Sequence, residues 1–253
     1  MDAKSLRILI RRLAPRAVAG FVLGSILILI LPAAATSNTA KVAASPTVSP
    51  INTPVGGVAP AEWTVRWWRW TRSFPHGLEP YMDRDGSRCA LEQDEHSPVW
   101  FLAGTNGRFD AKRSCQVPLG KHLLVPVINM YYQSPRSSED ASACADIKEA
   151  AAVNNDALVS AVVVLDGKNL GQPARLVSRC FDPYASDRDS GPAQERKSEH
   201  HAAADGYWVL LPPLSPGKHH LVIGANYGGD GQWAYSRMIQ NFEYELQIGD
   251  PQI

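Results

Sequence analysis

The sequence predicts a mainly β protein: an antiparallel β-sandwich, immunoglobulin-like or jelly-roll-like, with an N-terminal amphipathic helix and one mid-chain helix. Short apolar and β-branched segments alternate with glycine- and proline-rich turns along most of the chain, which is typical of sandwiches. Tryptophans at helical spacing precede these segments, and four cysteines follow a leader of the export type. We expect a signal segment at 1–35, a disordered linker at 36–61 and a single β-rich domain at 62–253.

The leader, residues 1–35, has the organisation of a signal peptide. Five basic residues come before an uncharged segment, 17–35, which ends with Pro32 and three alanines. Proline ends an apolar helix and small side chains suit signal peptidase, so we expect cleavage before Thr36. An uncleaved signal anchor is the alternative, since the uncharged segment approaches the length of a membrane span. The processed protein would be periplasmic or extracellular, and membrane-bound only in the anchored form.

The charge of the processed chain argues against nucleic acid as a partner. Five of the 25 basic residues and one of the 25 acidic residues lie in 1–35, which leaves 20 basic and 24 acidic residues and a formal net charge of −4. Binding to phosphate backbones needs a clustered positive face, which a mildly acidic body disfavours. The remaining length suits one sizeable core.

Four cysteines lie beyond the leader: Cys89, Cys115, Cys144 and Cys180. An even number in an exported chain predicts disulfides. Of the three pairings we expect the sequential one, Cys89–Cys115 and Cys144–Cys180, with each bond stabilising the fold by roughly 3 to 4 kcal/mol. Zinc is the weaker alternative, because no two cysteines have the Cys-x-x-Cys spacing and no histidine stands at finger spacing.

The linker and the first helix adjoin each other. Residues 36–61 hold four prolines and many Ser, Thr and Ala residues, too little apolar surface to fold. We expect a helix to follow, because four aromatic residues recur at the spacing of one helical face: Trp63, Trp67, Trp70 and Phe74. Pro60 suits the start of this helix and Pro75 should end it. The stripe predicts packing on a sheet, with an aromatic platform for a sugar or peptide as the alternative. Trp68 lies off the stripe, so we expect it to be exposed and available to a ligand.

The rest of the chain reads as short strands around one helix. Apolar segments 98–103 and 121–128 are bounded by glycine turns, and Ser138 can cap a helix over 139–153. Asp166-Gly167 predicts a hairpin from 158–165 to a return strand at 174–180, followed by a polar loop over 182–204. Three closing strands are expected at 207–211, 221–225 and 242–248. The last alternates cleanly, with its inward positions at Phe242, Tyr244, Leu246 and Ile248.

Several motifs together resemble a group of uncharacterised exported bacterial proteins, over residues 67–248. The motifs are Trp67-x-x-Trp70, Asp85-Gly86-x-x-Cys89, Val99-Trp100-Phe101-Leu102-Ala103-Gly104, Cys115-x-Val117-Pro118-x-Gly120-Lys121, Asp205-Gly206-Tyr207-Trp208 and Leu214-x-Pro216-Gly217-Lys218-His219. The resemblance implies export and a sandwich fold. It implies no activity and no catalytic residue.

Neither a metal nor a catalytic site is expected. Asp83-x-Asp85-Gly86-Ser87 begins like a calcium loop, but Arg88 stands where glycine is needed, and a turn rich in aspartate explains the same residues. His219 and His220 are adjacent on a strand and should point to opposite faces, so they cannot easily share a metal. No nucleophile motif of the G-x-S-x-G kind and no phosphate-binding glycine loop occurs.

Aromatic residues near glycines are the candidate ligand contacts. The segment 226–235 holds three glycines among Tyr227, Trp233 and Tyr235, a composition typical of recognition loops. Tyr131 and Tyr132 form a second pair. The alternative is that these rings fold back onto the sandwich as core.

We therefore expect a non-catalytic, disulfide-stabilised module that binds a glycan or an envelope protein and needs no cofactor. The first alternative is an envelope-directed hydrolase that uses a pair of carboxylates, for which Glu92, Asp94 and Glu95 are candidates. The second alternative is a purely structural envelope protein.

Overall fold

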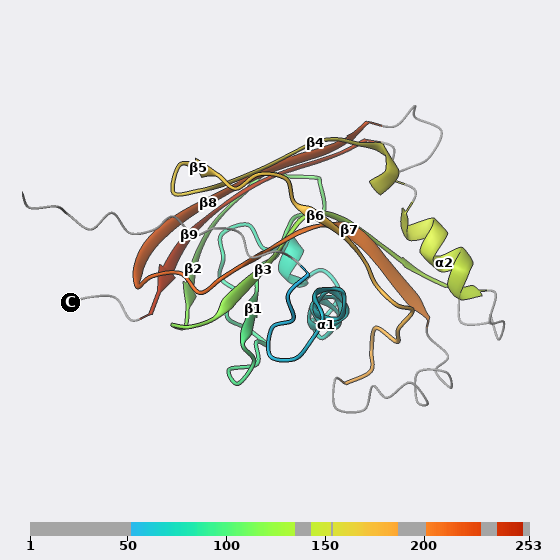
Figure 1. Ribbon diagram of the computed structural model, residues 1–253, viewed down its shortest axis with the longest axis horizontal. Coiled ribbons are helices and arrows are strands. Elements are labelled where there is room, and N and C mark those ends of the chain that lie inside the picture. Colours follow the sequence, from blue (N-terminus) through green and yellow to red (C-terminus); the bar gives the residue numbers. More distant parts are fainter. Residues whose placement is uncertain (1–51, 135–142, 153, 187–200, 229–236, 250–253) are drawn as a thin grey trace, which may run out of the picture. The chain divides into compact units, whose positions relative to one another are not determined.

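The computed structural model describes residues 52–134, 143–152, 154–186, 201–228 and 237–249 (Figure 1). All of them belong to one compact unit, Ala44–Ile253. In this part of the chain the protein is mainly β, with two sheets and two α-helices. None of the helices described is both long and apolar enough to cross a membrane.

The strands form a four-stranded and a five-stranded sheet. The four-stranded sheet has the order β1 (Val99–Phe101), β3 (His122–Gln133), β7 (Ala202–Leu211) and β6 (Ala174–Val177). The five-stranded sheet has the order β2 (Ala111–Val117), β9 (Arg237–Ile248), β8 (Gly217–Gly228), β4 (Leu158–Leu165) and β5 (Lys168–Asn169).

The prediction of a purely antiparallel arrangement is wrong, because two pairs of strands are parallel. β1 runs parallel to β3, and β2 runs parallel to β9. After β1 the chain leaves for the other sheet to form β2 and only then returns as β3. A tight hairpin cannot join strands that are separated in this way, and such a crossover permits parallel pairing.

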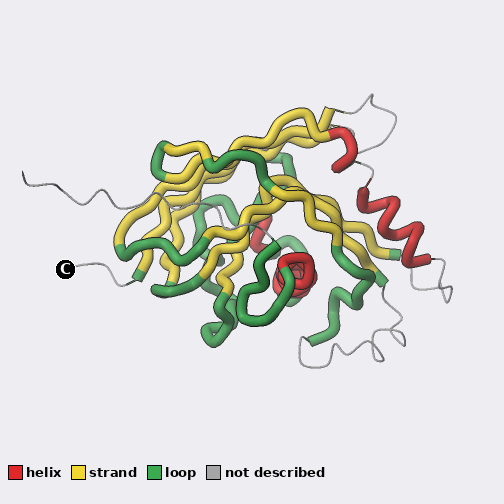
Figure 2. Tube along the Cα trace, viewed as in Figure 1, coloured by secondary structure: helices red, strands yellow, loops and turns green. Residues whose placement is uncertain are grey.

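The four-stranded sheet is covered on both faces. Successive strand residues point to opposite faces, so Leu123 and Val125 of β3 enter a core shared with the five-stranded sheet, whereas Leu124 between them enters a second core with the tryptophans of α1. On β7, likewise, Val209 enters the core shared with the five-stranded sheet and Trp208 enters the core with the tryptophans of α1. Figure 2 shows the resulting layers, with the helix seen end-on beneath one sheet and the other sheet above it.

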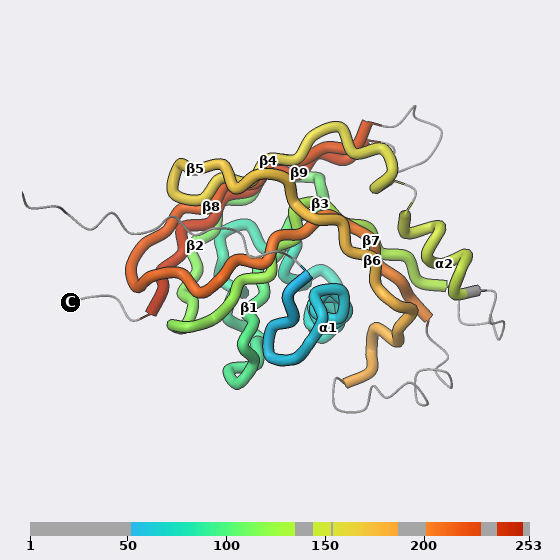
Figure 3. Tube along the Cα trace, viewed as in Figure 1, coloured from blue at the N-terminus to red at the C-terminus, as the bar shows by residue number. Residues whose placement is uncertain are grey.

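Helix α1 (Pro60–Arg72) begins with proline in its first turn and ends three residues before Pro75. All of the tryptophans of the predicted stripe are buried, with Trp63 and Trp67 at most 2% exposed. Two of the indoles also form hydrogen bonds to the backbone: Trp67 Nε1 donates to Leu102 O at 2.8 Å and Trp70 Nε1 donates to Leu91 O at 3.0 Å. The helix is therefore fastened to the segment around β1 as well as packed on it (Figure 3).

The folded part begins before the predicted boundary at Glu62. Val55 is only 8% exposed and forms an isolated bridge with Val58, and Trp63 Nε1 donates to Val55 O. The end of the segment predicted as a disordered linker is therefore part of the core around α1. The rest of that linker, up to residue 51, lies outside the described residues, as does the leader.

The second helix and the hairpin also differ from prediction in detail. Helix α2 (Ala143–Ala152) packs on β7 and β3, and the start of the predicted helix lies outside the described residues. The turn at Asp166-Gly167 is present, with both residues at positive φ, but it joins β4 to the short β5. The predicted return strand, β6, pairs instead with β7 in the other sheet. The three closing strands are longer than predicted, and Phe242, Tyr244, Leu246 and Ile248 point into the core as expected.

Both disulfides have the predicted sequential pairing. Cys89 is bonded to Cys115 and Cys144 to Cys180, and no cysteine is free. The first bond fixes the loop before β1 to β2, and the second fixes α2 to the segment after β6. Two disulfides indicate that the protein folds in an oxidising, exported location.

Candidate functional site

The candidate site is a cavity of about 770 Å³ at one end of α1, a volume in the range of ligand pockets. Five segments line it: the second half of α1, the following segment 76–82 with the short 3-10 helix Pro80–Met82, the loop 104–108, residues 129–131 of β3, and the start of β9. Only the tertiary fold brings them together.

An aromatic wall closes one side of the cavity. Trp67, Trp68 and Tyr131 all line it, and Trp68 stacks on Tyr131 with ring centroids 4.6 Å apart. The edge of Trp67 packs against Trp68 at 4.9 Å. The prediction that Trp68 is exposed is wrong: it is 8% exposed, because Tyr131 covers the side of α1 that the stripe leaves open. Trp68 and Tyr131 nevertheless both reach the cavity.

Three arginines contribute positive charge to the lining. Arg72 is half-buried, with its guanidinium 4.7 Å from the Tyr131 ring centroid, and Arg108 and Arg237 are exposed. None of these three forms an ion pair with a carboxylate of the described residues. Glu79 is the acidic lining residue in the described part of the chain, and its carboxylate accepts a hydrogen bond from Gly77 N at 2.7 Å. The cavity is therefore locally cationic.

Buried donors without a partner gather at the same place. Seven buried polar side-chain atoms of the described residues lack a hydrogen-bond partner, and three belong to residues that line the cavity: Trp68 Nε1, Arg72 Nε and Asn129 Nδ2. The other three tryptophans of α1 each donate to a backbone carbonyl. An unmet buried donor costs about 1–3 kcal/mol. These three atoms have almost no solvent-accessible surface, so a ligand oxygen would satisfy them only after a neighbouring side chain moves.

Two phenols of the cavity stay protonated at neutral pH. Burial, reinforced by the Glu79 carboxylate, raises the pKa of Tyr81 to about 12. Burial also raises the pKa of Tyr131 well above its ordinary value. Both hydroxyls therefore keep a proton to donate, and Tyr131 Oη donates to Gln133 Oε1 at 2.8 Å.

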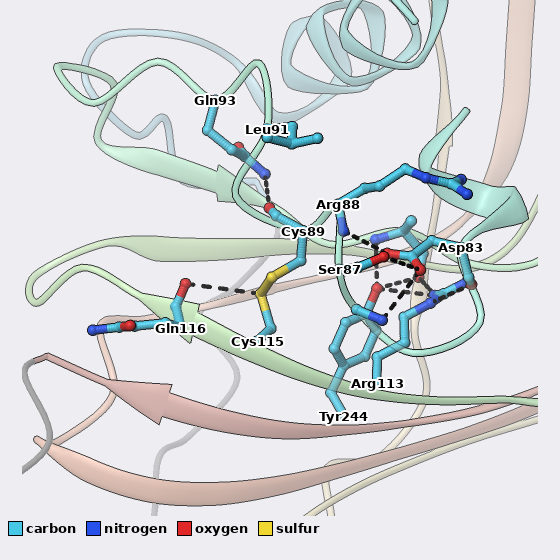
Figure 4. Close-up of a disulfide and its surroundings, with 12 residues drawn as sticks. Asp83, Ser87, Arg88, Cys89, Leu91, Gln93, Arg113, Cys115, Gln116 and Tyr244 are labelled. Atoms are coloured by element: carbon cyan, nitrogen blue, oxygen red, sulfur yellow. Dashed lines mark hydrogen bonds between the residues drawn. A yellow bond between two sulfur atoms is a disulfide. The ribbon is translucent and has the colours of Figure 1, made fainter. Parts of the chain in front are cut away.

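Arg113 fixes the backbone of the loop at the edge of the cavity. Its guanidinium is buried in β2 and donates to Ala103 O at 2.6 Å, Gly104 O at 2.9 Å and Asp83 O at 2.7 and 2.9 Å. It also donates to Tyr244 Oη at 2.9 Å, and burial raises the pKa of that phenol. Figure 4 shows Arg113 between Asp83 and Tyr244, beside the Cys89–Cys115 disulfide. Sequence reasoning missed this residue.

The motif that resembles a calcium loop is a turn stabilised by Asp83. The Asp83 carboxylate accepts hydrogen bonds from Gly86 N at 3.2 Å and Arg88 N at 2.9 Å, as in a turn capped by aspartate. Gly86 has φ +93°, and a Cβ there would lie 2.2 Å from Ser114 O. The described residues contain no group of three or more histidine, cysteine or acidic side chains placed to hold a metal.

The other predicted ligand contacts lie away from the cavity or outside the described residues. Tyr227 belongs to β8 and is 3% exposed, so its prediction as a surface residue is wrong. The β8–β9 ladder continues as far as Gly228 and turns Tyr227 into the core, where its hydroxyl donates to Asn155 Oδ1. Tyr132 is 43% exposed but does not line the cavity. Trp233 and Tyr235 lie outside the described residues.

A second polar cluster joins the β4–β5 turn to the β7–β8 loop. His219 Nδ1 lies 2.7 Å from Asp166 Oδ2, and His219 Nε2 lies 3.2 Å from Ser215 Oγ. This is the order of groups in a serine hydrolase triad, but Nε2 also lies 3.0 Å from the backbone oxygen of Ser215, which competes for the same nitrogen. The Asp166 carboxylate accepts from His220 N at 2.8 Å. We interpret the cluster as a clamp between two turns.

The clamp should make stability fall at acid pH. Burial alone would raise the pKa of Asp166, but hydrogen bonds from the His220 backbone and from His219 lower it below its usual value. A carboxyl with a lowered folded pKa stabilises the protein above the unfolded pKa, near 4, and this stabilisation is lost as the pH falls through the folded pKa. Because Asp166 is 41% exposed, we expect Asp166→Asn to cost less than about 1 kcal/mol at pH 7 and nothing at about pH 2.

Urea unfolding of both proteins between pH 2 and 7 measures this difference. Asn accepts the positive φ of residue 166, so the backbone is not strained by the change. Asp110→Asn, at another exposed position, is the matched control and should show no pH-dependent difference. A constant difference between wild type and Asp166→Asn across the range would contradict the clamp.

No family model and no curated protein matches the chain. A solved structure described as "Solution Structure of Amebosin" aligns with 55% of this chain and 95% of its own, at 8% sequence identity and a TM-score of 0.20. So slight a likeness carries no argument about fold or function.

Proposed function

We propose that the protein is an exported, non-catalytic binding module of the cell envelope or extracellular space, and that its cavity receives a glycan. The observation that carries the proposal is the cavity itself. It combines a ligand-sized volume and an aromatic wall with arginines and buried donors that have no ion-pair or hydrogen-bond partner among the described residues. Sites that bind oxygen-rich ligands use this mixture of amphipathic rings and convergent polar groups.

The compartment and the fold type belong to the same proposal. The two disulfides support folding outside the cytosol, and we infer a leader cleaved before Thr36 and a periplasmic or extracellular location. The resemblance to exported bacterial proteins points the same way. We further infer that the two sheets form a sandwich of the immunoglobulin-like or jelly-roll-like kind, modified by the parallel pairs β1–β3 and β2–β9.

A glycosidase mechanism has weaker support. Such enzymes use two carboxyl groups that face one another across the scissile bond. Among the described residues, Glu79 is the acidic residue that lines the cavity, and the candidates Glu92, Asp94 and Glu95 do not line it. A recognition role needs no second carboxylate.

Filling the cavity should abolish binding. Met238 lies on the cavity wall and is half-buried, so Met238→Trp would place an indole in the ligand volume. We expect at least a tenfold loss of affinity for the glycans that the oxidised wild-type protein retains in a screen of neutral and acidic oligosaccharides. Isothermal titration calorimetry of the full chain measures the change.

The neighbouring residue provides a matched control. Ile239 is 58% exposed on the opposite face of β9 and does not line the cavity, so Ile239→Trp adds the same ring to the same strand without entering it. Unchanged binding by Ile239→Trp together with loss in Met238→Trp supports the cavity. Equal binding by both variants, or no glycan retained by the wild type, would overturn the proposal.

A further inference from the structure

We infer that the glycan is acidic, with a carboxylate on at least one sugar ring that is held by the cavity arginines. This inference rests on the proposed function and narrows its ligand to one chemical class. Three features of the cavity carry it: its charge, its unmet donors, and the fact that its rings are already engaged.

The charge of the lining favours an anion. Arg72, Arg108 and Arg237 outnumber the one lining carboxylate of the described residues, Glu79. That carboxylate is already engaged, because it accepts from Gly77 N and lies 3.3 Å from His76 Nδ1. The formal net charge of residues 36–253 is −4, so the positive charge of the cavity lining is local and does not follow from the overall composition. A cleft of this kind concentrates anions and speeds their capture.

The unmet donors favour a carboxylate over a single hydroxyl. Trp68 Nε1 and Arg72 Nε come from side chains one helical turn apart on α1, and Asn129 Nδ2 comes from the adjoining strand β3. A carboxylate offers two oxygens with about four lone-pair sites, and a guanidinium matches it with two parallel hydrogen bonds. A neutral sugar hydroxyl has a single oxygen with two lone pairs, so it accepts fewer hydrogen bonds than a carboxylate, and its bond to a guanidinium has a charge on the donor only.

The aromatic rings do not offer a free platform for a neutral sugar. Tyr131 has Trp68 stacked on it and the Arg72 guanidinium over it, and Trp67 packs its edge against Trp68. These contacts leave less aromatic surface on which a neutral sugar ring could stack. The polar and charged groups of the cavity must supply most of the selectivity.

The experiment compares one oligosaccharide with and without its charge. The probes are an oligogalacturonate, the same oligomer with its carboxyl groups reduced to alcohols, and a poly-glutamate peptide of similar charge. The full-length oxidised protein is titrated with each by calorimetry at 50 and 300 mM salt. We expect the acidic oligomer to bind at least tenfold more tightly than its reduced form, and its affinity to fall several-fold at the higher salt.

Variants then test the arginines one at a time. Arg108→Ala and Arg237→Ala change exposed side chains, so they should fold normally, and each should weaken binding of the acidic oligomer about tenfold or more. Lys218→Ala is the matched control, since this exposed lysine on β8 does not line the cavity, and it should leave the affinity unchanged. Arg237→Lys keeps the positive charge but loses the guanidinium's two parallel donors. Its affinity for the acidic oligomer should therefore lie between that of wild type and that of Arg237→Ala.

The outcomes separate this inference from the proposed function. Equal binding of the acidic and reduced oligomers would overturn the inference and leave glycan binding in place. Binding of neither oligomer, together with no glycan retained in the screen of neutral and acidic oligosaccharides, would overturn both. Binding of poly-glutamate as tight as that of the acidic oligomer would overturn selectivity for a glycan. If Arg108→Ala and Arg237→Ala weakened binding of the acidic oligomer no more than Lys218→Ala does, the carboxylate would not be held by the cavity arginines and the inference would be overturned.

Discussion

Replacing Arg113 by methionine is expected to lower the free energy of unfolding by about 3–5 kcal/mol. Among the described residues the guanidinium has no carboxylate partner, and it is stabilised by hydrogen bonds to the backbone oxygens of Asp83, Ala103 and Gly104 and to the Tyr244 hydroxyl. Methionine fits the space but leaves several buried acceptors unmet. Chemical denaturation monitored by tryptophan fluorescence measures the loss.

A second arginine in the same region provides the control. Arg84 is exposed and lies with its guanidinium 4.0 Å from the centroid of the Phe109 ring, so Arg84→Met should cost no more than about 1 kcal/mol. If the two variants were equally stable, the hydrogen bonds of Arg113 would not be holding the loops. Because Gly104 also lines the cavity, we expect Arg113→Met to weaken ligand binding even where it remains folded.

Removal of the disulfides is the second large effect. The Cys89–Cys115 bond joins residues 26 apart and the Cys144–Cys180 bond joins residues 36 apart. In the chain-entropy model, loops of this length correspond to about 3.5 and 4 kcal/mol of stability. We expect Cys89→Ala with Cys115→Ala, and separately Cys144→Ala with Cys180→Ala, to lower the free energy of unfolding by about these amounts.

Denaturant unfolding of each double variant, with and without reductant, tests this expectation. Each variant retains the other disulfide, so reductant should destabilise it further, whereas a variant without any cysteine should not respond. Alkylation followed by mass spectrometry of the wild-type protein from its native compartment should find no free thiol. Four free thiols in that material would contradict both the pairing and the compartment.

Strand segments whose inward positions are apolar could be predicted from the sequence. In β9 the inward residues Phe242, Tyr244, Leu246 and Ile248 alternate with polar ones, and all four are buried. The earlier part of β9, whose inward and buried residue is Gln240, was not predicted. Strand β2 was missed, although its burial alternates just as regularly. Its inward positions include Arg113, which breaks the period-2 apolar pattern. The hydrogen-bond partners of Arg113 are backbone oxygens and the Tyr244 hydroxyl, all distant in the sequence.

The candidate site was predictable only in part, for a related reason. Trp68 and Tyr131 were singled out as aromatic residues, but their stacking on one another depends on how α1 lies against β3. The three arginines come from α1, from the loop before β2 and from the start of β9. No local pattern relates them, because the crossover between sheets and the parallel pairing that bring them together are long-range features.

Strand β9 lies between β2 and β8 and is paired with both along most of its length. The five-stranded sheet therefore cannot close until residues 237–248 have arrived, since until then β2 has no neighbour and β8 exposes one edge. Cooperative folding of this sheet therefore waits for the segment that forms β9, however early the other strands are available. Shortened chains that stop before Arg237 would present two bare strand edges, which invite aggregation.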